Sequence, residues 1–267
     1  MLLDYDPDFI CLQEFDPLYR NAQNGLIGQL SAQYTEVEID GMTTADAKNK
    51  IYNPIFYDHS KYTQEASGYV WFKDVIDVVD DEGNPLSSIT KEYDYPSGGT
   101  TYGRCLVWAV LKDAEGDRFL VANVHFSQES DVNKRAKIHT VEATFVANTL
   151  KGIADDYEDI TVLVGGDMNS NVKNSPDCGV DKMLSNGFTH TYNLTANRNN
   201  SATSTNSNGG FDTGYLDYAI DHILTLNEDL NVRSFFVLTE MDRKVTGPNG
   251  TETRISDHLP VRMTFYK

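Results

Sequence analysis

Short apolar runs separated by clusters of turn-forming residues dominate the chain, a pattern typical of β-strands in a mixed α and β domain. The clearest runs are residues 104–111 and 119–126, which flank the acidic turn 113–117 and predict a hairpin. Both runs are apolar at nearly every position, so we expect strands that are buried on both faces. Further strands are predicted over residues 9–12, 160–164, 216–224 and 261–265.

Helical spacing occurs in only a few segments. Apolar residues recur at steps of three and four from Ile138 to Phe145, which predicts a helix over residues 132–152. Ser130 or Asp131 would cap its N-terminus. A shorter helix is predicted over residues 18–30, so strands outnumber helices in the expected fold.

One long stretch, residues 195–215, matches neither period. It is rich in Asn, Ser, Thr and Gly, and Arg198 and Asp212 are its only ions. Such a stretch is typical of a surface loop or a functional lid. The chain shows no internal repeat and no long linker, so we predict a single domain over residues 1–267.

Composition sets limits on the partners of this domain. The chain has 267 residues, with 22 Lys and Arg against 40 Asp and Glu, which gives a formal net charge of −18. A charge of this sign argues against affinity built on many phosphate contacts or on an anionic membrane. Phosphate chemistry in this protein would therefore need a cation from elsewhere.

The sequence offers no membrane or export signal. Its longest apolar run, Cys105–Leu111, is far shorter than the roughly 20 residues that a membrane helix needs. The first residues carry acids and no basic leader, so no signal peptide is expected, and an extracellular or a cytoplasmic location stays open. We expect the protein to be a monomer.

The polar residues with chemical potential lie where predicted strands end. The chain contains no GxxxxGK[ST] phosphate loop, no HExxH zinc pair and no GxSxG nucleophile elbow. Each remaining group taken alone also matches ordinary turn chemistry, whereas all of them together in this order favour one shared site. The groups are LQE (12–14), NVH (123–125), GDMN (166–169), IDHI (220–223) and SDH (256–258).

The acids in these groups predict a metal. If Glu14, Asp167, Asp221 and Asp257 converge, four like charges raise one another's pKa values or need a cation to neutralise them. Hard oxygen ligands favour Mg²⁺ or Mn²⁺, with Ca²⁺ as a further candidate. Such an ion would also attract a phosphate that the acidic surface otherwise repels.

The segments LQE, ANVHF, GGDMNS, IDHIL and ISDHLPV resemble, in order and context, the signature segments of the endonuclease/exonuclease/phosphatase superfamily. Pancreatic-type deoxyribonuclease, neutral sphingomyelinases and inositol polyphosphate phosphatases belong to this superfamily. The resemblance covers about residues 8–266. It implies an α+β fold, a four-layer α/β/β/α sandwich of two mixed β-sheets, with Mg²⁺-dependent phosphoester hydrolysis at one rim.

The resemblance also implies roles for the acidic residues. Glu14 would be the principal metal ligand, with Asp257 and Asp167 as further metal contacts. Asp167 would in addition orient or deprotonate the attacking water. Asn169 would donate a hydrogen bond to a phosphate oxygen, where charge develops in the transition state.

For the histidines, the resemblance implies a pair that flanks the phosphate. His258 would carry a proton or donate a hydrogen bond there, and Asp221 would orient it and set its tautomer. His125 would face His258, with Asn123 supporting it from the same face of the strand. Arg104, at the start of a buried strand, would meet the substrate phosphate.

The chain departs from the superfamily pattern at two places. Where deoxyribonuclease-like members have a Glu that partners the first histidine, this chain has Cys105, so His125 has no carboxylate partner in the sequence pattern. Members also begin with a strand that ends in Asn and a helix before LQE. Here LQE lies on the first predicted strand, so we expect the domain to be N-terminally short by one central strand, either because the chain is truncated or because another segment fills the gap.

These observations favour a metal-dependent hydrolase of a phosphodiester, with nucleic acid as the leading substrate. Sphingomyelinase-like or inositol-phosphate phosphatase activity is the alternative within the same chemistry. The acidic composition disfavours tight non-specific DNA binding but permits a nuclease that makes few contacts. An alternative of another class is a catalytically weak or inactive binding module that uses residues 195–215 as its contact loop.

Overall fold

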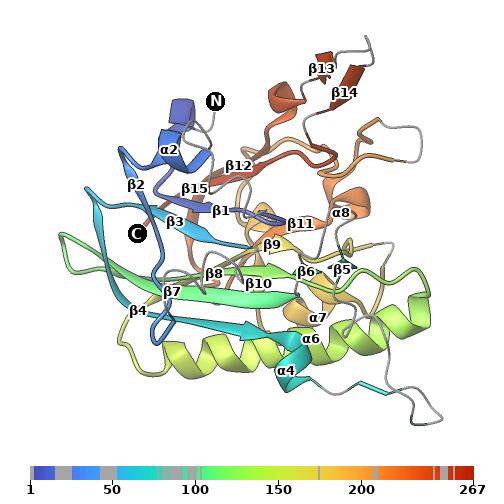
Figure 1. The fold of residues 1–267 in the computed structure, drawn as a ribbon, viewed down its shortest axis with the longest axis horizontal. Helices are drawn as coiled ribbons and strands as arrows, with labels where there is room; N and C mark the ends of the chain where they lie inside the picture. The colour runs from blue at the N-terminus through green and yellow to red at the C-terminus, as the bar shows by residue number, and fades with distance from the viewer. Residues whose placement is uncertain are drawn as a thin grey trace.

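The structure is a computed structural model, and Figure 1 shows its ribbon. The predicted helix over residues 18–30 lies outside the described residues except for its last turn, α2 (Leu26–Leu30). The described residues are 3–15, 26–42, 53–76, 78–79, 83, 93–94, 101–102, 104–173, 175–206, 210–242, 244–246, 252–254 and 256–267.

A six-stranded sheet lies at the centre, in the order β10-β11-β9-β8-β7-β4 (Figure 1). β8 and β9 pair in parallel, and the other neighbours pair antiparallel, so the sheet is mixed. The predicted hairpin is confirmed as β7 and β8. The strands of the sheet are β4 (Tyr62–Trp71), β7 (Cys105–Asp113), β8 (Arg118–His125), β9 (Thr161–Asp167), β10 (Thr189–His190) and β11 (Asp221–Thr225).

Both faces of this sheet are covered. On β7, Leu106 and Val110 join the core under the helices, whereas Val107 and Leu111 join a second core on the opposite side. This alternation follows from the period of two along a strand. The expectation that the hairpin strands are buried on both faces is therefore confirmed.

The second β layer consists of two pieces, in the orders β1-β3-β2 and β12-β15. The Phe119 ring of β8 packs against Phe9 at 5.7 Å and against Phe265 at 6.1 Å, so both pieces cover one face of the central sheet. Among the described residues, β1 pairs only with β3 and β15 only with β12. Their bounds are β1 (Phe9–Cys11), β2 (Tyr34–Glu36), β3 (Ile55–Asp58), β12 (Asn231–Val237) and β15 (Val261–Tyr266).

Helices form the outer layers. α6 (Val132–Ala154) covers the free face of the central sheet and packs beside α7 (Gly179–Ser185), which confirms the predicted helix (Figure 1). The Asp131 side chain accepts hydrogen bonds from the backbone of Asn133 and Lys134, as an N-cap does. On the other side α2 packs against β1 and β3. The architecture is thus the predicted α/β/β/α sandwich.

The predicted strand over 216–224 differs from the structure. Its first half is a helical turn, α8 (Tyr215–Tyr218), and the strand begins only at Asp221. Gly214, with a φ of 121°, turns the chain so that the Tyr215 ring stacks on Tyr192 at 4.6 Å in a buried aromatic cluster. Tertiary packing therefore outweighs the strand-like pattern here.

The stretch 195–215 is largely irregular, as predicted, yet its middle is not a surface loop. Ala202 and Thr203 are buried, and the backbone oxygen of Thr203 accepts a hydrogen bond from Leu259 at 2.7 Å.

No helix among the described residues is long and apolar enough to cross a membrane. The remaining elements are η1 (Leu3–Tyr5), α4 (Phe72–Val75), β5 (Tyr93–Asp94), β6 (Thr101–Tyr102), η2 (Thr191–Leu194), η3 (Thr239–Met241), β13 (Lys244–Thr246) and β14 (Glu252–Arg254).

Candidate active site

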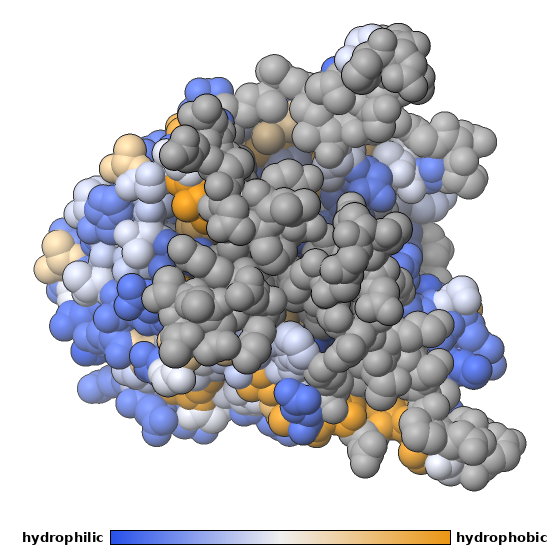
Figure 2. Space-filling model, in the orientation of Figure 1, coloured by the Kyte–Doolittle hydropathy of each residue, from blue (hydrophilic) through white to orange (hydrophobic). Residues whose placement is uncertain are grey.

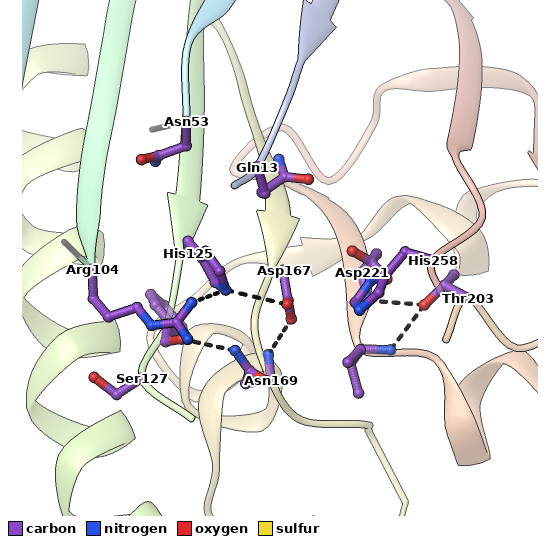
Figure 3. Close-up of polar contacts among 12 residues, drawn as sticks. Gln13, Asn53, Arg104, His125, Ser127, Asp167, Asn169, Thr203, Asp221 and His258 are labelled. Atoms are coloured by element: carbon purple, nitrogen blue, oxygen red, sulfur yellow. Dashed lines mark hydrogen bonds and ion pairs between the residues drawn. The ribbon is translucent and has the colours of Figure 1, made fainter. Parts of the chain in front are cut away.

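Three neighbouring strands of the central sheet place polar side chains in one row (Figure 3). His125 ends β8 and pairs in register with Asp167, which ends β9. Asp167 in turn pairs with Asp221, the first residue of β11. Adjacent strands lie about 4.8 Å apart, so the three side chains stand at one edge of the sheet although they are far apart in sequence.

His258 completes this row from the segment that leads into β15. Its Nδ1 lies 2.9 Å from Oδ2 of Asp221. One potential ligand atom each from Asp167, Asp221 and His258 lies within 4.8 Å of the other two. The Thr203 hydroxyl accepts a hydrogen bond from the backbone nitrogen of Asp221 at 3.1 Å, so the segment 202–206 helps to hold this part of the site.

The two carboxyl groups have opposite titration behaviour. Burial and the negative charge of Asp221 raise the pKa of Asp167 to about 7. Burial alone would raise the pKa of Asp221 as well, but the charge and the hydrogen bond of His258 lower it. Burial disfavours protonated His258, yet the carboxylates of Asp221, Asp167 and Asp257 outweigh this effect and raise its pKa to about 10. His258 and Asp221 therefore form an ion pair near neutral pH.

His125 lies on the other side of Asp167 in a different environment. Its Nε2 is 3.3 Å from Oδ2 of Asp167 and also contacts Nη1 of Arg104. Burial, followed by the positive charges of Arg104 and His258, holds the pKa of His125 well below its usual value. The imidazole is therefore neutral near neutral pH, and Asp167 is the carboxyl group beside it. Cys105 points away, because its thiol donates a hydrogen bond to Oδ1 of Asn53.

Asn169 follows Asp167 in a tight Asx turn with a positive φ of 46°. Its backbone nitrogen donates to Oδ1 of Asp167 at 2.8 Å, and its Nδ2 donates to the backbone oxygen of Phe126 at 2.9 Å. Gly166 lets β9 pass close to β8, since a Cβ there would lie 1.9 Å from the backbone oxygen of Val124. This local geometry places Asn169 beside the row of polar side chains (Figure 3).

Asn123 occupies a position behind the row. Its side chain is fully buried, and its Nδ2 donates to the backbone oxygens of Leu12, Asn53 and Pro54. Its Oδ1 accepts from Nε2 of Gln13 at 2.7 Å. Asn123 thus ties the central sheet to the second β layer.

The structure does not bring Glu14 and Asp257 into the close group of Asp167, Asp221 and His258. Glu14 follows β1 with a positive φ of 52° and is exposed. Asp257 is also exposed, although it is near enough to His258 to help raise the pKa of the imidazole. Among the described residues, the group of three is the one set of His, Cys, Asp or Glu that could hold a metal ion.

The chemistry of this group fits a divalent cation. The two carboxyl groups offer ligand atoms at a short mutual distance, and burial together with the negative charge of Asp221 disfavours the charged form of Asp167. A cation between the carboxylates would offset this effect. Oxygen donors of this kind suit Mg²⁺ or Mn²⁺.

Comparison with known proteins gives a likeness in structure alone. No protein-family model matches the chain, and no curated protein matches it. An endonuclease/exonuclease/phosphatase family protein from Bacteroides thetaiotaomicron matches with a TM-score of 0.65 at 20% identity, over 98% of this chain and 84% of that chain. The mannosyl-6-phosphatase Bt3783 from the same organism matches with a TM-score of 0.63 at 19% identity, over 100% and 88%.

The catalytic domain of human nocturnin, with a bound sulfate anion, matches with a TM-score of 0.59 at 18% identity, over 99% of this chain and 83% of that chain. Each of these three structures matches almost the whole chain, although its sequence is identical to this one at only about one residue in five. The chain therefore has the same fold as these endonuclease/exonuclease/phosphatase-type structures, which is the fold that its sequence motifs predict.

Proposed function

We propose that the protein is a divalent-metal-dependent hydrolase of phosphoester bonds that acts on a phosphodiester. The observation that carries the proposal is the row formed by His125, Asp167 and Asp221 together with His258, in which a neutral and a cationic imidazole flank a carboxyl group. A proton donor, His258, and a proton acceptor, Asp167, are thus close together at the ends of neighbouring strands. The fold likeness to a named phosphatase supports the same reaction class.

In this proposal water attacks phosphorus, and the bond from phosphorus to the leaving oxygen breaks. Asp167 accepts the proton of the water, and the imidazolium of His258 donates a proton to the leaving oxygen. Asn169 has a second amide hydrogen to donate to a non-bridging oxygen. The buried Arg104 guanidinium, beside His125, provides positive charge for the same phosphate.

A bound Mg²⁺, or Mn²⁺ or Ca²⁺ in its place, would polarise the phosphate oxygens. Asp167 would hold it together with Asp221, and Glu14 and Asp257 are further candidate ligands. Glu14 lies just after β1, and Asp257 lies just before His258. Both exposed acids are therefore on segments that border the site.

Nucleic acid is the leading substrate, with sphingomyelin-like lipids and inositol phosphates as the alternatives. Most of the described surface visible in Figure 2 is hydrophilic, and the chain carries a net charge of −18. A polyanion would therefore bind through few contacts, and its affinity would depend only weakly on salt.

The test is hydrolysis of an aryl phosphodiester with Mg²⁺ or Mn²⁺, with and without a chelator. We expect Asp167→Asn and His258→Ala each to lower kcat by about 10²-fold or more. Asp156→Asn, the same change at an exposed acid beyond the far end of β9, is the matched control and should retain full activity. Equal rates for the wild type and the Asp167→Asn, His258→Ala double variant would refute the proposal.

Plasmid nicking, sphingomyelin cleavage and release of phosphate from inositol phosphates, measured side by side, would rank the substrates. We expect the plasmid to give the highest kcat/KM. A binding module without catalysis would give no chelator-sensitive turnover with any of the three.

A further inference from the structure

A second group of polar side chains lies beneath the candidate site, inside the core under α6. His139 and Glu142 are both fully buried there, on the helix face that also carries Ile138 and Val146. A polar group in such a place costs free energy unless its hydrogen bonds are made. Their partners therefore show what the two side chains hold.

Both side chains bind the same residue, Ser127. Glu142 accepts hydrogen bonds from the backbone nitrogen of Ser127, at 3.1 Å, and from its hydroxyl, at 2.5 Å. His139 donates from Nε2 to the backbone oxygen of Ser127 at 2.7 Å. The N–H, O–H and C=O groups of Ser127 are thus all bound by one turn of α6.

His139 also reaches the loop that follows β9. Its Nδ1 accepts a hydrogen bond from the backbone nitrogen of Gly179 at 2.9 Å, at the start of α7. The next residue, Val180, donates its backbone N–H to the hydroxyl of Ser170, which directly follows Asn169. A neutral imidazole with its proton on Nε2 makes both contacts, and burial lowers the pKa of His139 to about 4, which keeps it neutral.

The clamped residue adjoins the candidate site. Ser127 lies two positions after His125 and is drawn below Arg104 in Figure 3. Phe126, between them, donates its N–H to the backbone oxygen of Asp167 and accepts from Nδ2 of Asn169, each at 2.9 Å. Within the 126–127 segment, Ser127 is therefore held by α6, and Phe126 orients Asn169. We call the contacts of Glu142 and His139 with Ser127 the clamp.

We propose that Glu142 and His139 are positioning residues for the reaction: through Ser127 they set the 126–127 segment and, with it, the orientation of His125 and Asn169. This inference rests on the proposed phosphodiester hydrolysis. Within the described part of the chain, the side chains of Glu142 and His139 bind Ser127 and Gly179 and none of the site residues, so both act through the backbone. Because a shift of about 1 Å at a reacting group can cost 10²-fold in rate, loss of the clamp lowers kcat more than it raises KM.

Two variants of Glu142 separate positioning from burial. Glu142→Leu leaves the Ser127 N–H without a partner, and we expect kcat on the aryl phosphodiester to fall by about 10²-fold. Glu142→Gln can accept from the N–H and donate to the Ser127 hydroxyl, so it should restore kcat to within about threefold of the wild type. Val146→Ala, on the same buried helix face, is the control that loses core packing without loss of a hydrogen bond.

The comparison is decided at a temperature where all four proteins are folded. Equal kcat values for Glu142→Leu and Val146→Ala would overturn the inference, as would a Gln variant no more active than the Leu variant. His139 offers an independent check. His139→Gln keeps a donor for Ser127, His139→Asn keeps an acceptor for Gly179, and we expect the Gln variant to have the higher kcat. The reverse order would contradict a clamp that acts through Ser127.

A readout without substrate keeps this inference separable from the proposed function. In NMR spectra, Glu142→Leu should abolish the exchange protection of the Ser127 amide and shift the side-chain amide signals of Asn169, whereas Val146→Ala should do neither. Unchanged Asn169 signals beside lost Ser127 protection would overturn the inference. If the wild type hydrolyses no phosphoester, the proposed function fails and this NMR comparison alone decides the inference.

Discussion

The two sides of the candidate site carry the same side chain in opposite charge states. His125, at the end of β8, has a pKa well below the usual value, while His258, before β15, has a pKa of about 10. Burial lowers the pKa of both histidines, so burial alone does not explain the contrast. For His125 burial is the larger cause and the charge of Arg104 adds to it, whereas for His258 the charge and the hydrogen bond of Asp221 outweigh burial.

This contrast shows how two histidines at one site can take different roles because their surroundings differ. A neutral imidazole can accept a hydrogen bond or a proton, whereas an imidazolium can donate one. Pairs of titratable groups whose environments move their pKa values apart are the usual basis for separate acid and base roles.

The largest effect is expected from Asp221→Asn. Without the carboxylate, the pKa of His258 falls in the metal-free protein, and the imidazole loses the partner that sets its tautomer. We expect kcat to fall by about 10⁴-fold, since the same change at an orienting Asp has an effect of this order in a serine protease. NMR titration of the His258 ring protons and steady-state kinetics measure the two results. An unchanged pKa would contradict the assignment of Asp221 as the source of the shift.

Next in size is the pH dependence of stability. Burial lowers the pKa of His222 to about 4, whereas an unfolded chain titrates near 6.5. Its contribution is therefore fully present above pH 6.5 and is lost as the pH falls through 4, by up to about 3 kcal/mol. His258 has the opposite sign, because its contribution is fully present below pH 6.5 and is lost as the pH rises through about 10.

Urea unfolding of the wild type and of His222→Gln at pH 7 and pH 4.5 measures this difference. Gln keeps a donor for the Ser170 backbone oxygen, which Nε2 of His222 binds at 2.8 Å, but it does not titrate. The stability advantage of the wild type over the variant should shrink at the lower pH. An advantage that grows instead would show that His222 is charged in the folded state.

A somewhat smaller effect is expected from Arg104→Gln. The variant removes the cation nearest to His125, so the pKa of His125 rises, yet stays below its usual value because the ring remains buried. Loss of the charge should also lower kcat/KM by about 10²-fold, chiefly through KM, since charge-assisted contacts with phosphate are strong. Kinetics and NMR titration test both parts, and a lowered His125 pKa would contradict the electrostatic account.

The smallest effect is expected from Asp131→Ala at the N-cap of α6. Two backbone N–H groups lose their acceptor, and the free energy of unfolding should fall by about 1 kcal/mol. The pKa values of His125 and His258 should not change, because the cap lies outside both environments. Urea unfolding and NMR titration of the same sample check this result, and a shift in either histidine would show that the contrast is not local.

Local patterns made much of this fold predictable. The hairpin β7–β8 follows from two apolar runs around an acidic turn, and α6 follows from spacing at three and four residues. Each of these patterns is contained in a short stretch of sequence, so no distant contact is needed to interpret it. The helical turn at 215–218 was missed because its conformation depends on Tyr192, a distant partner in the aromatic cluster.

The site shows the same division. Strand-end motifs singled out His125, Asp167, Asn169, Asp221 and His258. His139 and Glu142 were missed, although a His and a Glu among the apolar positions of a helix are themselves a signal of a buried polar contact. Thr203 carried no comparable signal within a stretch that reads as a surface loop.

By itself the sequence determined which residue types stand at the ends of which strands, because side-chain period and turn chemistry are local properties. Only the tertiary structure decided that Asn123 faces inward, that Glu14 and Asp257 remain exposed, and that two histidines differ in charge. Burial and charge depend on neighbours contributed by distant segments. Those neighbours, and the distances to them, exist only once the chain has folded.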